Sequence, residues 1–186
     1  MEKKARQAYL RLQTERGHPV KVQLDGLFVS RQRPYLAAST NGIIVTRDGD
    51  RGVLEIKCPV ADVSVEALVS CRKNFCLEQS GADLKLKRSH PYFTQLQMEM
   101  ALTGCQWADF VVFVDRLEDA DESLLVEPVK FEPKLWSEFV CTLEAFYVKF
   151  VVLELLTRRL KRHVKLLPGA ACFFSVFPHV SAVENC

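Results

Sequence analysis

The triplet Glu55-Ile56-Lys57 places a carboxylate and an ammonium group two residues apart. Alternate residues of a β-strand point to opposite faces, so a strand here puts Glu55 and Lys57 on one face and Ile56 on the other, in the core. Mg²⁺ binds carboxylate and phosphate oxygens, and a neighbouring lysine can orient or deprotonate an attacking water and offset charge on a phosphate. The triplet therefore fits phosphodiester hydrolysis, although alone it is also typical of an exposed cross-strand ion pair.

A hairpin is expected to complete this constellation. The runs "GIIV" and "GVLEIK" flank the turn "TRDGDR", and Asp48-Gly49 is a strong hairpin signal. A hairpin that turns about Gly49 places Asn41 opposite Lys57. An asparagine amide can ligate a cation through its oxygen, but it brings no negative charge, so it attracts Mg²⁺ less than an aspartate would. None of the acids near this hairpin in the sequence, Asp25, Asp48 and Asp50, is an obvious substitute.

Three segments together resemble a known family. They are "PYLAASTNGII", "GVLEIKCPV" and "HPYFTQLQMEMALTGCQWADFVVF". They are similar to the YqaJ-type viral recombinase family, which includes the phage lambda exonuclease and belongs to the PD-(D/E)XK nuclease superfamily, and the similarity runs from about Glu2 to Arg159. The resemblance implies an α/β fold with a restriction-endonuclease-like core, in which helices flank a central mixed β-sheet. It also implies a Mg²⁺-dependent exonuclease, with Mn²⁺ as a substitute ion, that acts on DNA independently of sequence in recombination and repair.

The resemblance also implies roles for individual residues. The catalytic residues are then Glu55, Lys57, Gln95 and Gln97, and the metal ligands are Glu2, Glu55, the backbone carbonyl of Ile56, and Asn41 in place of the family's aspartate. Ser39 matches the family's serine and is expected to contact DNA. Gln95 and Gln97 lie about 200° apart around a helix, so both cannot face the metal equally. We favour Gln95, because Tyr92 and Glu99 share its face.

Basic residues indicate further contacts with DNA. The candidates for binding DNA phosphates are Arg31, Arg33, Lys85, Lys87 and Arg88, each of which has the alternative of facing solvent. A second basic cluster, "TRRLKRHVK" from residue 157 to 165, fits either a solvated helix end or a phosphate-contacting or nuclear-localising segment. The net charge of only +2 does not by itself indicate a nucleic-acid-binding protein.

Two functions remain open at this point. The first is a metal-dependent DNA exonuclease whose site is weakened or inactivated by Asn41, either naturally or through a substitution. The second is a non-catalytic DNA-binding module on a nuclease fold. Glu55, Lys57 and Gln95 favour the first, and Asn41 favours the second. The several motifs disfavour an interaction domain unrelated to DNA.

The elements expected to position these residues alternate between helices and strands. Helices are predicted over residues 2–16, 62–75, from 91 to 104 and from 134 to about 163. Strands are predicted over residues 20–30, 42–45, 52–57, 107–115 and 124–132, with a short hairpin that turns at Ser80-Gly81. Residues 1–165 are expected to form one nuclease domain, followed by a tail of unknown role at 166–186.

Composition places the chain among globular proteins. Of its 186 residues, 48% are hydrophobic and 26% charged, and no apolar run reaches the length of a membrane span. The start "MEKKARQAYLRLQ" lacks the apolar region of a signal peptide. Seven scattered cysteines fit reduced thiols. We therefore expect an intracellular protein, cytoplasmic or nuclear, with no membrane partner; the sequence leaves its oligomeric state open.

Overall fold

The computed structural model describes residues 1–115 and 124–158. The chain divides into two compact units, Met1–Phe131 and Glu132–Cys186, which are described one at a time. The first unit contains every residue predicted to take part in catalysis or metal binding.

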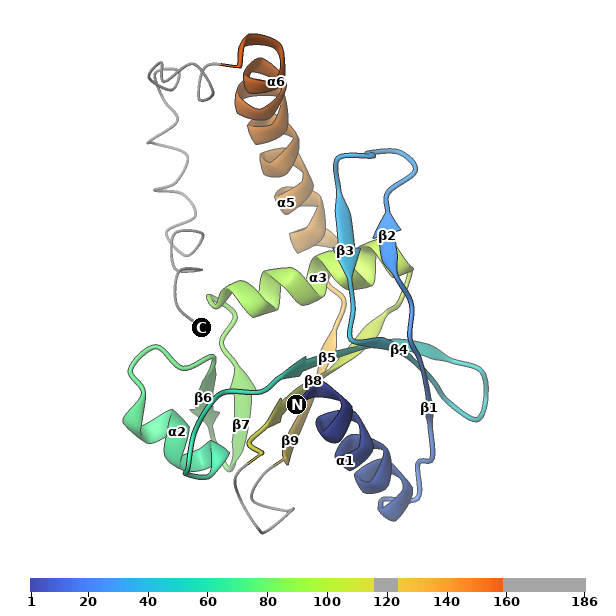
Figure 1. Cartoon of the computed structure of the whole chain (residues 1–186), viewed down its shortest axis with the longest axis vertical. Helices are drawn as coiled ribbons and strands as arrows, with labels where there is room; N and C mark the ends of the chain where they lie inside the picture. Colours follow the sequence, from blue (N-terminus) through green and yellow to red (C-terminus); the bar gives the residue numbers. More distant parts are fainter. Residues whose placement is uncertain (116–123, 159–186) are drawn as a thin grey trace. The chain divides into compact units, whose positions relative to one another are not determined.

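A five-stranded mixed sheet forms the centre of the first unit (Figure 1). Its strands, in spatial order, are β1 (Lys21–Gln23), β4 (Gly42–Val45), β5 (Arg51–Lys57), β8 (Trp107–Phe113) and β9 (Leu124–Lys130). Strands β5 and β8 are parallel, and the other neighbours are antiparallel. Two small hairpins accompany this sheet, formed by β2 (Leu27–Val29) with β3 (Ala37–Ser39) and by β6 (Leu77–Ser80) with β7 (Asp83–Leu86).

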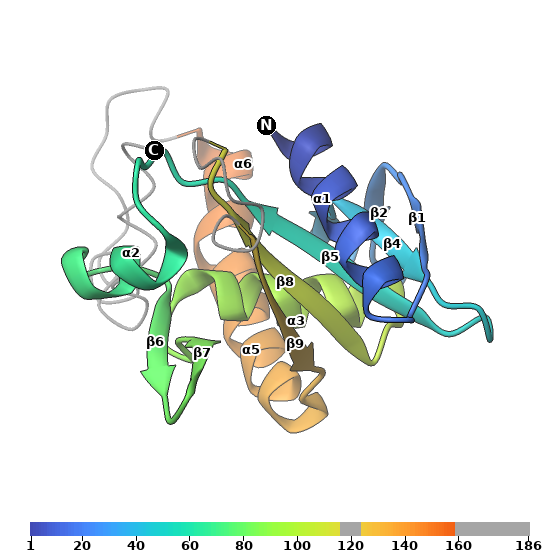
Figure 2. The same ribbon diagram turned by 90° about the horizontal axis from the view of Figure 1, so that it is seen from below.

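Helices α1 (Glu2–Glu15) and α3 (Pro91–Thr103) pack on opposite faces of this sheet (Figure 2). Ala5, Ala8 and Tyr9 of α1 join a buried cluster that includes Ile56 and Val111. The ring of Tyr92, on α3, contacts Phe110, which adjoins Val111 in β8 and therefore points to the other face. The predicted α/β architecture, a mixed sheet flanked by helices, is confirmed.

The predicted register of the β4–β5 hairpin is wrong. Thr46 N–H donates to the carbonyl of Asp50 at 2.9 Å, so the turn holds the three residues from Arg47 to Gly49 and is centred on Asp48. Gly49 has φ +90°, the backbone conformation that a three-residue hairpin loop needs at its last position. Gly42 consequently pairs with Leu54, and residue 41 falls opposite Glu55 rather than Lys57.

Most of the other predicted elements of this unit are confirmed. Helix α3 starts with Pro91 directly after the cap residue His90 and ends at Gly104, whose φ of +75° stops the helix. Helix α2 (Val65–Cys71) is shorter than predicted. The strand predicted over 20–30 is two strands, β1 and β2, interrupted at residues 24–26, and β3 is an additional strand that the sequence pattern does not predict.

The second unit is helical where the structure describes it. It comprises α5 (Pro133–Phe146), the π-helical segment η1 (Tyr147–Val152) and α6 (Leu153–Thr157). The long predicted helix is confirmed as far as residue 157, and its last predicted turns lie outside the described residues. The boundary predicted at residue 165 and the tail also lie outside them. Within residues 1–115 and 124–158, no helix has both the length and the apolar character needed to cross a membrane.

Candidate active site

The carboxyl end of β5 carries an almost buried ion pair. Lys57 Nζ lies 2.8 Å from Glu55 Oε1, and their side chains are 22% and 5% exposed. Ile56, between them, packs in the cluster beneath α1. The alternation predicted from the sequence is therefore confirmed, with Glu55 and Lys57 turned away from α1 and towards α3.

Gln95 joins this pair from α3. Its amide nitrogen donates to Glu55 Oε1 at 2.8 Å, and its amide oxygen accepts from Lys57 Nζ at 3.3 Å. Glu55, Lys57 and Gln95 thus form a closed ring of polar contacts, named here the Glu55–Lys57–Gln95 cluster. The amide orientation is set by these partners, because a flipped amide would turn its oxygen towards a carboxylate.

Tyr92 limits the position of the lysine. Lys57 Nζ lies 4.0 Å from the centre of the Tyr92 ring, a cation–π distance. A carboxylate, an amide oxygen and a ring face therefore surround the ammonium group. From the sequence, Tyr92 is recognisable only as a residue on the same helix face as Gln95, and its contact with the lysine is not predicted.

Glu99 lies one helical turn after Gln95 and is not among the predicted site residues. It is 1% exposed, and its Oε1 accepts from the Gln95 amide at 2.7 Å. Its Oε2 is buried without a hydrogen-bond donor among the described residues. Burial, with a smaller contribution from the charge of Glu55, raises the pKa of Glu99 to about 8.

Asn41 ends the β4–β5 ladder. Its Oδ1 accepts from Ile56 N–H at 2.8 Å, and its own N–H donates to the Leu54 carbonyl at 3.1 Å. The side chain thus takes the place of a backbone acceptor where β4 stops. The carbonyl of Ile56 lies on the same edge of β5 as its N–H, since both groups of a strand residue point to the same side.

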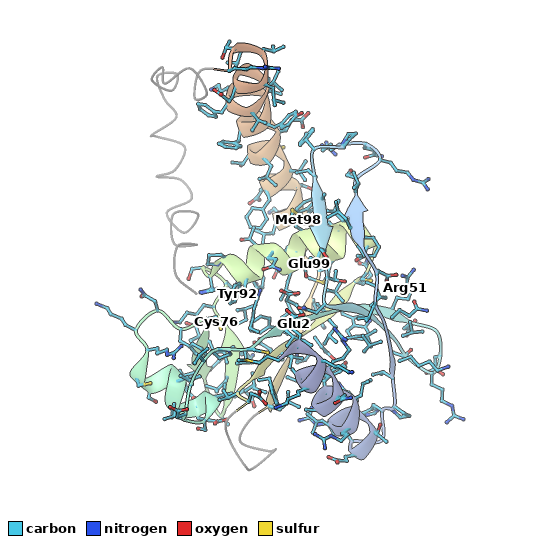
Figure 3. The ribbon with its side chains drawn as sticks, in the orientation of Figure 1. Glu2, Arg51, Cys76, Tyr92, Met98 and Glu99 are labelled. Atoms are coloured by element: carbon cyan, nitrogen blue, oxygen red, sulfur yellow. The ribbon has the colours of Figure 1, made fainter. Side chains whose placement is uncertain are left out.

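Glu2, at the start of α1, lines an open hollow beside this edge. The hollow is formed by Met1, Glu2, Lys3, Ile56, Lys57 and Cys58. Glu2, Tyr92 and Glu99 are labelled in Figure 3, where they lie around the central part of the sheet. The structure therefore places Glu2, Ile56 and Lys57 around one hollow.

Gln97 is not brought to the cluster. It is fully buried, and its amide nitrogen donates to the Lys130 carbonyl on β9 at 3.0 Å. The helical spacing predicted this divergence from Gln95.

The residues predicted to bind DNA lie on three segments. Ser39 is exposed at the end of β3, two residues before Asn41, and Arg31 and Arg33 lie between β2 and β3. Lys85 is exposed on β7 opposite Glu78, and the Arg88 guanidinium lies 4.9 Å from the centre of the Phe93 ring. Lys87 is half-buried directly after β7.

The predicted ligands of a cation are hard oxygen atoms. They comprise the Glu55 carboxylate, the Ile56 carbonyl, the Asn41 amide oxygen and the Glu2 carboxylate, a set that suits Mg²⁺ or Mn²⁺ rather than zinc. Within the part of the chain that the structure describes, no three His, Cys, Asp or Glu side chains gather into a metal-binding group. Mg²⁺ commonly uses only one or two carboxylates together with water and phosphate oxygens, so the donor set fits this ion.

The fold is a mixed β-sheet flanked by helices. A carboxylate, a lysine and a glutamine gather at the end of an interior strand of this sheet. This combination defines a nuclease-like class of protein. The profile of the YqaJ-like viral recombinase domain matches residues 1–106, more than half of the chain. The chain therefore belongs to the YqaJ-like viral recombinase domain family.

Two solved structures extend the comparison. The chain is similar to an alkaline exonuclease, LHK-Exo, from Laribacter hongkongensis, with 28% sequence identity and a TM-score of 0.56, over 84% of this chain and 68% of that one. The complex of LHK-Exo with dAMP gives the same values. A comparison with curated protein sequences finds no match.

Proposed function

We propose that the chain is a Mg²⁺-dependent DNA exonuclease of the PD-(D/E)XK type that hydrolyses phosphodiester bonds in DNA recombination and repair. The Glu55–Lys57–Gln95 cluster is the single observation that carries this proposal. Exposed surface ion pairs contribute little, whereas this pair is almost buried, shares Gln95 as a third partner and has its lysine against the Tyr92 ring. The family membership and the likeness to an exonuclease support the same reaction class.

The chain's own residues have separate tasks in this reaction. Glu55, the Ile56 carbonyl, Asn41 and Glu2 would hold the cation, which would stabilise negative charge on the phosphate. Lys57 places its ammonium group beside the scissile phosphate and offsets charge that develops there. Gln95 and Tyr92 hold that ammonium group in position. Gln97 has a structural task, because its buried amide donates to the Lys130 carbonyl and joins α3 to β9.

Contacts with DNA are made to phosphates and carry no sequence preference. Ser39, Arg31, Arg33, Lys85, Lys87 and Arg88 are the residues to which we assign these contacts, because phosphate-contacting side chains bind any sequence. The likeness to an exonuclease whose complex with dAMP is known supports a nucleic-acid substrate.

Asn41 supports a second candidate function. Its Oδ1 already accepts from Ile56 N–H, and its amide adds no negative charge to the cation site. A chain that binds DNA through the same surface without cleaving it would keep the basic residues but would not need the Glu55–Lys57–Gln95 cluster. The intact cluster is why we place the nuclease first and treat Asn41 as weakening it.

Digestion of two DNA substrates tests the proposal. Linear duplex DNA and covalently closed circular DNA are incubated separately with the full chain and Mg²⁺. An exonuclease degrades only the linear form, and Glu55→Gln abolishes that degradation. Binding of both DNA forms with no loss of either, in Mg²⁺ and in Mn²⁺, establishes the DNA-binding candidate instead.

A further inference from the structure

A buried acid on α3 has no evident place in the residue set that the sequence predicted. Glu99 is 1% exposed, and its Oε2 has no hydrogen-bond donor among the residues that the structure describes. Burying a carboxyl group with an open acceptor costs free energy, and buried polar atoms are nearly always satisfied. A buried, unsatisfied oxygen atom next to a cation site indicates a ligand or charge that binds there.

Glu99 is linked to Glu55 through Gln95. One amide nitrogen, that of Gln95, donates to Oε1 of Glu55 at 2.8 Å and to Oε1 of Glu99 at 2.7 Å. The two carboxyl groups are therefore held on either side of one NH₂ group, whose hydrogens carry only partial positive charge. The groups that face Glu99 are Glu55 and Lys57 from β5 and Gln95 from α3 itself, and Lys57 is paired with Glu55.

Glu99 on α3 brings an acidic group to the site, whereas the residue at position 41 does not. The family's aspartate there is replaced by Asn41, whose amide oxygen is committed to the backbone of β5. Asn41 completes the sheet but contributes no charge, whereas Glu99 has a carboxyl group that shares the Gln95 amide with Glu55. The chain thus still has two acids at this centre, one on β5 and one on α3.

We propose that Glu99 is a positioning residue that supplies a further negative charge next to the cation site at Glu55, in place of the acid absent at position 41. A divalent cation bound at Glu55 attracts this charge through space, and Gln95 couples the two carboxyl groups. Because Glu99 is buried, it holds a proton until the cation binds, and cation binding releases that proton to solvent. The inference rests on the proposed function only for the presence of a cation site at Glu55.

Isothermal titration of the full chain with Mn²⁺ tests this inference without DNA. The titration is performed at pH 7 in two buffers that differ in ionisation enthalpy, which gives both the affinity and the number of protons released. The wild type is expected to release roughly one proton for each Mn²⁺ bound. Glu99→Gln, which has the shape of the protonated acid and keeps an acceptor for Gln95, is expected to bind Mn²⁺ at least about tenfold more weakly and to release no proton.

Two further variants control the result. Asp109 is also a buried acid, hydrogen-bonded to Tyr9 on the α1 side of the sheet, so Asp109→Asn is expected to leave both values unchanged. In Asn41→Asp/Glu99→Gln one acid replaces the other, and the affinity is expected to return to within about threefold of the wild type.

The contrary results are distinct. An unchanged affinity of Glu99→Gln, an absence of proton release from the wild type, or no binding of Mn²⁺ by the wild type overturns the inference. The proton count of the wild type needs no variant, so an absence of proton release overturns the inference even if Glu99→Gln does not fold. Binding of Mn²⁺ through Glu99 without any DNA cleavage contradicts the proposed function alone, and cleavage with an unchanged Glu99→Gln affinity contradicts this inference alone.

Discussion

The Oδ1 atom of Asn41 lies 2.8 Å from the backbone nitrogen of Ile56 and accepts its hydrogen bond, so the side chain at position 41 completes the sheet next to Glu55. An aspartate oxygen accepts the same bond. An aspartate at this position would therefore change the charge next to Glu55 and leave the local structure intact.

Restoring that charge is expected to raise activity. Asn41→Asp adds a carboxylate with little change of volume, and we expect Mg²⁺-dependent degradation of linear duplex DNA to become about tenfold faster or more. A fluorescence assay with end-labelled duplex measures the rate. Asn41→Ala serves as the control: it removes the bond to Ile56 N–H, so it is expected to lower the free energy of unfolding by about 1 kcal/mol without any gain in rate. Equal rates for wild type and Asn41→Asp contradict the assignment of this position to the cation site.

The two glutamines of α3 form a matched pair. Gln95→Leu removes the amide that holds Lys57, so we expect the cleavage rate to fall about 100-fold, together with a loss of about 1–3 kcal/mol in the free energy of unfolding because the buried Glu55 and Glu99 lose their donor. Gln97→Leu removes the hydrogen bond from a fully buried side chain to the Lys130 carbonyl, so we expect the free energy of unfolding to fall by about 1 kcal/mol with the rate nearly unchanged. Urea denaturation and single-turnover cleavage measure the two quantities. The opposite pattern of rates would show that Gln97 is the glutamine that acts in catalysis.

How far the sequence predicts this site depends on the kind of spacing involved. The period of two in a strand was enough to place Glu55 and Lys57 on one face, and the helical period was enough to separate Gln95 from Gln97. The sequence did not predict the hairpin register correctly, because Asp48-Gly49 fits more than one loop length. The three-residue loop shifts residue 41 to a position opposite Glu55. Glu99 was visible only as a residue on the Gln95 face, since the sequence does not reveal burial.

The second unit illustrates another limit. Trp136, Phe139, Leu143, Phe146 and Phe150 have the spacing of a buried helical stripe, yet each is only half-buried. Helical periodicity identifies an apolar face, but it does not say how completely that face is covered.

Binding of DNA is expected to weaken with salt. Phosphate contacts release counterions, so the logarithm of the association constant should fall linearly with the logarithm of salt concentration. Replacing both Lys85 and Arg88 by glutamine should reduce that slope by about one for each phosphate that the variant no longer neutralises. Fluorescence anisotropy measures the affinity, with Arg51→Gln, at the exposed turn end of β5, as the control. A wild-type affinity that is independent of salt would contradict the assigned phosphate contacts.

The raised pKa of Asp109 is expected to make the stability of the fold depend on pH. Its burial raises its pKa above the ordinary value of 3.8, against the opposing effects of Tyr9, Arg16 and Gln13. Between 3.8 and the raised value the folded chain holds this proton more tightly than the unfolded chain. The stability contributed by Asp109 is therefore fully present below this window and is lost as pH rises through it.

Asp109→Asn removes this titration and keeps an acceptor for the Tyr9 hydroxyl. The difference in free energy of unfolding, wild type minus variant, is thus expected to decrease as pH rises through the window. Urea denaturation at a series of pH values measures it. If the free energies of unfolding of the two proteins change with pH in parallel, burial does not shift the pKa of Asp109.

Hydrolysis in water enriched in ¹⁸O tests the central claim most directly. Linear duplex DNA is digested by the full chain with Mg²⁺, and the released mononucleotides are analysed by mass spectrometry. If the Glu55–Lys57–Gln95 cluster directs water at the phosphate, nucleotides from internal positions carry one ¹⁸O atom on their phosphate, and Glu55→Gln releases none. Intact DNA in the wild-type reaction, or equal release of labelled nucleotides by Glu55→Gln, would contradict the account.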